Sequence, residues 1–120
     1  MLGLERDKVV LTPYQDAWVH LFNEEKRRLE VIGRGVLEVQ HAGSTSILGM
    51  KAKPVLDIGV AVESFEEASA LVPLVEELGY TYRGEHGIPR RHYFVKGSPE
   101  NRTHHIHMLE GRSEDWRVLL

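Results

Sequence analysis

Apolar side chains recur at helical spacing near the start of the chain. Trp18, Phe22 and Leu29 fall on one side of a helical projection of residues 15–32. Gly33 follows at the position where a helix commonly ends. We therefore predict a first helix that buries these three side chains against the rest of the protein.

Two strands are predicted next by their apolar content. Residues 36–41 are rich in β-forming side chains, and residues 54–62 form an apolar run broken by one charge, Asp57. A run that is apolar at nearly every position is typical of an inner strand covered on both faces. We expect Asp57 to be the polar exception in such a strand.

A second helix is predicted from its capping residues. Ser64 and Glu67 have the spacing of a capping box, in which each side chain binds a free backbone amide of the first turn. The apolar pattern then continues to Leu78, and Gly79 is suited to ending a helix.

Three further strands and a capped helix complete the predicted order. Residues 80–83, 91–96 and 103–109 have strand composition, and the turn-forming residues between the last two predict a hairpin. Ser113 has the character of a helix cap, yet the apolar residues after it are left without partners, so we expect a further C-terminal helix to be missing from this chain. The predicted class is α/β (α+β), with a mixed sheet flanked by helices.

Length, composition and net charge limit the number of domains and the classes of protein to which this chain can belong. The 120 residues, of which 42% are hydrophobic and 28% charged, suit one folded domain over residues 1–120. The sequence contains no cysteine, which excludes disulfides and thiolate metal ligands and suits the cytoplasm. A net charge of -3 and the lack of a long apolar run argue against bulk nucleic-acid binding and against a membrane span.

A short polar loop follows the first strand. Gly43, Ser44 and Thr45 offer closely spaced amides and hydroxyls, an arrangement that suits phosphate. The alternative is an ordinary turn in which one hydroxyl caps a short helix.

Asp57 needs a partner, because a charge is almost never fully buried unless it is paired or bound to a metal. We expect it to lie where the sheet opens to a ligand. The alternative is a salt bridge to Lys51 or Lys53.

The order of this loop and the strand aspartate resembles the nucleotidyltransferase superfamily. Longer motifs resemble the GrpB family, for which a nucleotidyltransferase-like fold is expected and some members of which are fused to dephospho-CoA kinase. These motifs are Pro13-Tyr14, His41-Ala42-Gly43-Ser44-Thr45-Ser46, Lys53-Pro54-Val55-Leu56-Asp57-Ile58, Gly87-Ile88-Pro89-Arg90-Arg91 and Arg102-Thr103-His104-His105-Ile106-His107. The resemblance to the nucleotidyltransferase superfamily implies, for an active enzyme, a second metal-binding carboxylate two residues after Asp57, where this chain has Gly59.

Histidines are the other candidates for this centre. His105 and His107 are two residues apart on a predicted strand and so share a face, and His41 stands near the end of another strand. With Asp57 they would form a ligand set for a divalent transition metal ion. The alternative is a closed network in which the histidines hydrogen-bond to Asp57 without any ion.

Basic residues extend the expected binding site. Arg90 and Arg91 are suited to bidentate contacts with phosphate, and Lys53 would add a charge near the same opening. The alternative for the arginine pair is a solvated hairpin loop.

These observations favour a domain that binds a nucleotide or another phosphorylated small molecule, with Asp57, His105 and His107 at its catalytic or polar centre. Metal-assisted nucleotidyl or phosphoryl transfer is the enzymatic form of this hypothesis. Two alternatives stay open: a non-catalytic nucleotide-binding or regulatory module, and a histidine-dependent phosphoesterase.

Overall fold

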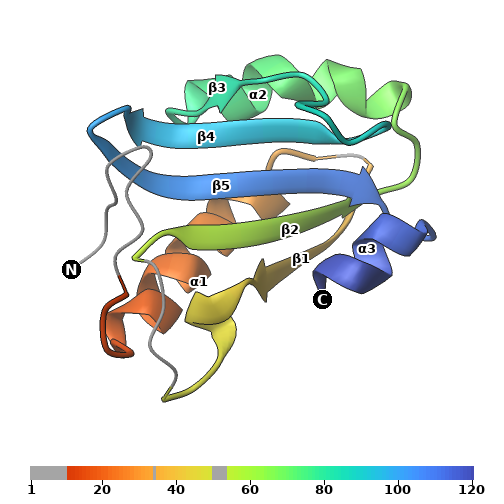
Figure 1. Ribbon diagram of the computed structural model, residues 1–120. Helices are drawn as coiled ribbons and strands as arrows, with labels where there is room; N and C mark the ends of the chain where they lie inside the picture. Colours follow the sequence, from red (N-terminus) through yellow and green to blue (C-terminus); the bar gives the residue numbers. More distant parts are fainter. Residues whose placement is uncertain (1–10, 34, 50–53) are drawn as a thin grey trace.

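The computed structural model describes residues 11–33, 35–49 and 54–120 (Figure 1). Three α-helices and two short 3₁₀-helices accompany five strands in these ranges. The helical elements are α1 (Ala17–Glu30), η1 (Ser44–Ser46), η2 (Glu67–Leu71), α2 (Val72–Glu77) and α3 (Glu114–Leu119). The strands are β1 (Val36–Ala42), β2 (Leu56–Val62), β3 (Thr81–Tyr82), β4 (His92–Ser98) and β5 (Asn101–Glu110).

The strands form one mixed sheet in the order β1-β2-β5-β4-β3. The β1–β2, β5–β4 and β4–β3 pairs are antiparallel, whereas β2 and β5 run parallel. The parallel pairing sets Asp57 opposite His105 and Gly59 opposite His107. Because side chains alternate along a strand, this register brings all four residues to the same face.

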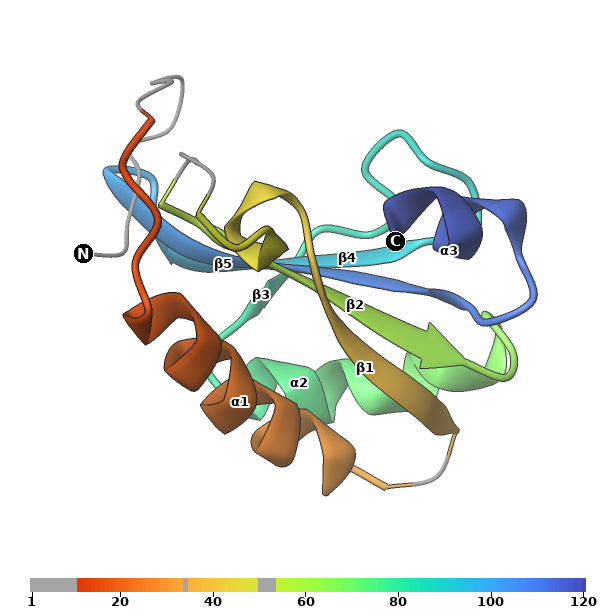
Figure 2. The same ribbon diagram turned by 90° about the horizontal axis from the view of Figure 1, so that it is seen from below.

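Helices cover the two faces of the sheet unequally (Figure 2). We call the face under α1 and α2 the inner face, and the opposite face, which carries α3 at one end, the outer face. The main hydrophobic cluster lies on the inner face and includes Phe22, Ile58, Val75, Phe94 and Ile106. A smaller cluster under α3 joins Ala61, Leu109 and Trp116. The mixed sheet flanked by helices is thus confirmed.

The first helix matches its prediction closely. It ends at Glu30, shortly before Gly33, whose positive φ of 117° suits glycine. Trp18, Phe22 and Leu29 are all buried, as their spacing predicts. The inner strand is also confirmed, since every residue of β2 except Asp57 is buried.

The second predicted helix ends where expected, but it is divided into a 3₁₀-helix and an α-helix. Ser64 Oγ accepts a hydrogen bond from the Glu67 amide at 3.3 Å, yet a 3₁₀-helix precedes the α-helix. Pro73 explains the break, because it has no amide hydrogen to donate to the preceding turn. The backbone amides of Leu78 and Gly79 then donate hydrogen bonds to carbonyls of the last turn, where the helix ends.

The end of the chain differs from its prediction. Ser113 caps α3 as expected, with its Oγ accepting from the Trp116 amide at 3.1 Å. Trp116, however, is buried and has partners, while Val118 remains 76% exposed. The expected lack of partners therefore fails for Trp116, because α3 folds back onto the outer face. No helix in the described ranges is long and apolar enough to cross a membrane.

Candidate functional site

Asp57 lies on the outer face of β2, directly behind the turn that follows β1. A Cβ atom placed on Gly43 would lie 2.6 Å from Asp57 Oδ2, so only glycine allows the turn to approach this carboxylate. Gly43 also has a positive φ of 69°. The sequence therefore needs glycine here for two reasons, one steric and one conformational.

His105 and His107 meet the same carboxylate oxygen from β5. His107 Nε2 lies 3.1 Å from Asp57 Oδ1, and His105 Nδ1 lies 3.4 Å from it. The parallel register of β2 and β5 produces this convergence. The prediction that the three side chains come together is confirmed, and we call them the Asp57 cluster.

The carboxyl of this cluster is held in its charged form. Burial raises the pKa of Asp57, but hydrogen bonds from His105 and His107, and the charge that these rings carry when protonated, outweigh burial and lower that pKa to about 2. The side chains of Asp57, His105 and His107 are 30%, 29% and 16% exposed. The cluster therefore combines a fixed negative charge with access to solvent.

Arg91 and Tyr93 adjoin the cluster from β4 and the loop before it. The Arg91 guanidinium lies over the Tyr93 ring, 4.3 Å from its centroid, and its Nη1 lies 3.2 Å from His107 Nδ1. Arg91 also donates to the carbonyls of Glu85 and His86. Most of its donors thus bind the protein, and burial lowers the pKa of this buried side chain.

His41 does not join the Asp57 cluster. It pairs with Ile58 rather than with Asp57 and stacks on Phe22 of α1, with ring centroids 4.8 Å apart. Its Nε2 lies 2.9 Å from Thr45 Oγ1. The expectation that His41 shares ligands with Asp57 is therefore corrected, because strand alternation turns its ring to the inner face.

The predicted phosphate loop forms a tight turn. The Ser46 amide donates to the Gly43 carbonyl at 3.2 Å, and Ser46 Oγ donates to the same oxygen at 2.6 Å. Thr45 is buried and its hydroxyl faces His41, so the hydroxyl is not free for a ligand. The Ser44 side chain and all of Lys53 lie outside the described residues.

The cluster is not arranged as a metal centre. Both histidine nitrogens face an oxygen of Asp57, so the donors bind one another instead of a common point. Within the described ranges, no three His, Asp or Glu side chains are placed to hold a metal ion. This geometry matches the hydrogen-bonded alternative.

Gly59 stands where the resemblance to active nucleotidyltransferases implies a second carboxylate. A Cβ atom on Gly59 would lie 2.8 Å from Trp116 Cζ3 and 2.9 Å from Leu119 Cδ2. The side chains of α3 thus fill the space that a longer residue would need. A carboxylate at this position would require α3 to move.

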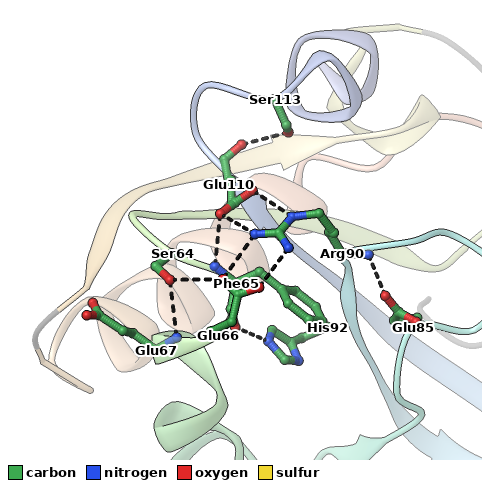
Figure 3. A network of polar contacts seen from close by, with 9 residues as sticks. All are labelled: Ser64, Phe65, Glu66, Glu67, Glu85, Arg90, His92, Glu110 and Ser113. Atoms are coloured by element: carbon green, nitrogen blue, oxygen red, sulfur yellow. Dashed lines mark hydrogen bonds and ion pairs between the residues drawn. The ribbon is translucent and has the colours of Figure 1, made fainter.

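Arg90 lies at the far end of β5 from His105 and binds three segments together (Figure 3). Its Nη1 donates to Glu66 at 2.7 Å, and its Nη2 donates to Glu110 at 2.9 Å. Its own amide donates to Glu85 at 2.6 Å. Arg90, which we expected to bind phosphate, is here directed at two carboxylates and is not part of the cluster.

Sequence reasoning overlooked Tyr93 and His86 as neighbours of the cluster. The Tyr93 ring centroid lies 5.4 Å from that of His107, and His86 stacks on Tyr93 at 5.0 Å. Tyr93 lies two residues after Arg91, and that spacing on a strand was an available signal. His86 gave no such signal, because its place depends on a loop with positive φ at both His86 and Arg90.

Comparison with known proteins identifies relatives over nearly the whole chain. The family model described as "GrpB protein" matches residues 8–120. A UPF0157 protein, YqkA of Bacillus subtilis, is 43% identical over 104 residues, which are 86% of this chain and 30% of that protein. The glutamate-rich protein GrpB of Alkalihalophilus pseudofirmus is 36% identical, over 97% of this chain and 70% of its own length.

A solved structure shares the fold. The crystal structure of conserved protein GrpB from Enterococcus faecalis has a TM-score of 0.82 and 39% identity to this chain. The match covers 91% of this chain and 66% of the Enterococcus protein. This chain therefore spans less than two thirds of that protein and less than a third of YqkA.

Proposed function

This chain belongs to the GrpB family, and we propose that it binds a nucleotide or another phosphorylated small molecule on its outer face. The ligand would lie between the turn at Gly43 and the Asp57 cluster. The single observation that carries this proposal is the cluster itself: a charged, partly exposed carboxylate that contacts two histidines beside a glycine turn.

The turn supports a phosphate ligand. Gly43 has left-handed backbone geometry and is followed by helical residues, a combination that directs successive amides toward one side. Such concave groups of amides favour anions. The close approach of Gly43 to Asp57 also supports a nucleotidyltransferase-like fold, in which the strand aspartate follows a glycine loop.

The chemistry proposed for this site uses one carboxylate. Two-metal transfer needs metal ions shared between carboxylates and phosphate oxygens, and the space beside Gly59 is filled by Trp116. We therefore place binding, without a requirement for Mg²⁺, ahead of nucleotidyl transfer.

A histidine-dependent phosphoesterase is the second candidate. The contact between His105 and Asp57 favours it, because a carboxylate beside an imidazole orients the ring for proton transfer. Release of phosphate from a nucleotide would distinguish this enzyme from a module that only binds.

Thermal unfolding tests the proposal directly. We would measure the Tm of the protein with inorganic phosphate or ATP, each in EDTA and in Mg²⁺. A ligand that binds only the folded state at a hundred times its Kd adds about 2.7 kcal/mol to stability. We expect Tm to rise with ATP in EDTA as well as in Mg²⁺.

Two glycine variants locate the binding site. Gly43→Ala places a methyl group against Asp57 and should abolish the rise in Tm. Gly35→Ala is the matched control, since Gly35 also has a positive φ but has no atom within 4 Å of the added carbon. Equal ATP responses in both variants would contradict the proposal, as would no response in the unaltered protein.

A further inference from the structure

We infer that the two histidines of the Asp57 cluster have different roles: His105 contacts the phosphoryl ligand through Nε2, and His107 is a positioning residue. The inference rests on the proposed function, because it assigns a ligand-contacting atom within that same site. It follows from the hydrogen bonds of the two rings, which sequence position alone treats as equivalent.

His107 has both ring nitrogens in use. Arginine has only donors, so the contact between Arg91 Nη1 and His107 Nδ1 requires Nδ1 to be the acceptor. The proton of the neutral ring is then on Nε2, which donates to Asp57 Oδ1 at 3.1 Å. A ligand could bind His107 only by breaking one of these two bonds.

Arg91 is itself held in place, which makes the arrangement of His107 stable. Its Nε donates to the Glu85 carbonyl at 3.3 Å and its Nη2 to the His86 carbonyl at 3.0 Å. The Tyr93 ring lies beneath the guanidinium. A buried arginine with this many partners fixes the ring that it contacts.

His105 uses only one of its two ring nitrogens in a contact with the described residues. Its Nδ1 faces Asp57 Oδ1 at 3.4 Å, and in the described part of the chain Nε2 has no hydrogen-bond partner. Its side chain is 29% exposed, against 16% for His107. His105 is thus the ring that can share a proton with a phosphoryl oxygen while it keeps its contact with Asp57.

The nitrogen signals of the two rings test this assignment. In ¹⁵N-labelled protein without ligand, we expect the His107 ring to carry its proton on Nε2, with Nδ1 as an acceptor. Addition of inorganic phosphate should shift the Nε2 signal of His105 and leave the Nδ1 signal of His107 in place. A proton on Nδ1 of His107 in the ligand-free protein would overturn the inference whether or not phosphate binds.

Conservative variants test the roles by affinity. His105→Asn keeps a polar group near the position of Nδ1 but lacks Nε2, and we expect about a tenfold loss of phosphate affinity with little change in Tm. His107→Gln keeps a donor near the position of Nε2, and its affinity should stay within about threefold of the unaltered protein. His107→Ala should lower both phosphate affinity and Tm. His107→Gln should therefore retain the affinity and the stability that His107→Ala loses.

His20→Asn is the matched control, because His20 is an exposed histidine of α1. Unchanged affinity in His105→Asn, or a tenfold loss in His107→Gln at unchanged Tm, would overturn the inference. Failure of the unaltered protein to bind phosphate or ATP would instead refute the proposed function, and the ring pattern would still decide how the two histidines are held.

Discussion

Glu25 and Asp57 lie on opposite faces of the sheet, each among polar partners, and the two carboxylates differ in what surrounds them. On the inner face, Glu25 is only 2% exposed and accepts hydrogen bonds from Tyr80 at 2.6 Å and Lys96 at 3.0 Å. Arg28 also pairs with it. On the outer face, Asp57 contacts two histidines and stays 30% exposed.

The difference separates a structural network from a candidate binding site. Tyr80 lies just before β3 and Lys96 lies in β4, so these two donors connect α1 to the sheet. Water has little access to the carboxylate. A ligand would gain nothing there without unfolding the helix. The Asp57 cluster, by contrast, leaves one histidine nitrogen without a partner in the described part of the chain, at a position that solvent reaches.

The largest expected effect is on the inner face and concerns pH. Burial lowers the pKa of His104 to about 4; Glu25 opposes this shift, while Lys96, Arg28 and His105 add to it. The unfolded chain therefore binds a proton near pH 6.5 that the folded chain accepts only near pH 4. The free energy of unfolding should fall by about 3 kcal/mol between these pH values.

Urea denaturation at pH 6.5 and at pH 4 measures this effect. In His104→Asn the fall should be smaller by about that amount, while His20→Asn should behave as the unaltered protein does. If the His104 variant showed the full fall, the inner face would not hold this histidine in its neutral form.

The next effect comes from removing the inner carboxylate. Glu25→Ala leaves Tyr80 and Lys96 without their acceptor, and breaking a buried pair is costly because the remaining groups stay desolvated. Lys96 can turn partly to water, so we expect a loss of about 2 to 3 kcal/mol by urea denaturation. Glu24→Ala, one residue earlier and exposed, should change stability by less than about 0.5 kcal/mol.

The stability contributed by Asp57 on the outer face should be lost at a lower pH than the stability that depends on His104. The pKa of Asp57 is about 2 in the folded chain against an ordinary 3.8, so its contribution is present above pH 4 and lost as the pH falls toward 2. This contribution is about 2 kcal/mol. Asp57→Asn should lack the loss between pH 4 and 2, and Asp16→Asn should retain it.

The smallest effect tests the end of the outer face under α3. Gly59→Ala adds a methyl group against Trp116, and overpacking costs about 1 to 3 kcal/mol. Alanine also restricts the unfolded chain more than glycine does, which offsets about 0.5 to 1 kcal/mol of this cost and leaves a net loss of about 1 kcal/mol. In a Trp116→Ala background the same change should be neutral or stabilising, and an unchanged loss would show that α3 does not cover Gly59.

Local patterns were sufficient to predict much of this architecture. The spacing of Trp18, Phe22 and Leu29 located the first helix and its buried face. The spacing of His105 and His107 placed them on one face, and the isolated charge of Asp57 indicated the strand that they would meet. These predictions depend on periodicity, which is a property of neighbouring residues.

Other features depend on contacts between distant segments, and the sequence did not predict them. The face to which His41 points relative to Asp57 is set by the antiparallel register, which pairs His41 with Ile58. Similarly, Arg91 reaches His107 because its loop adopts positive φ at two non-glycine residues. No local pattern shows that Trp116 will cover Gly59.

The parallel pairing of β2 and β5 also determines when the Asp57 cluster can form. Parallel neighbours cannot be joined by a tight turn, so η2, α2, β3 and β4 all lie between these two strands in the chain. Closing such a long connection costs entropy before any contact is gained, and contacts distant in sequence slow folding. During synthesis Asp57 therefore leaves the ribosome well before His105 and His107. During refolding the Asp57 cluster can form only after β1 and β2 have paired with β5, β4 and β3 through the β2–β5 contact.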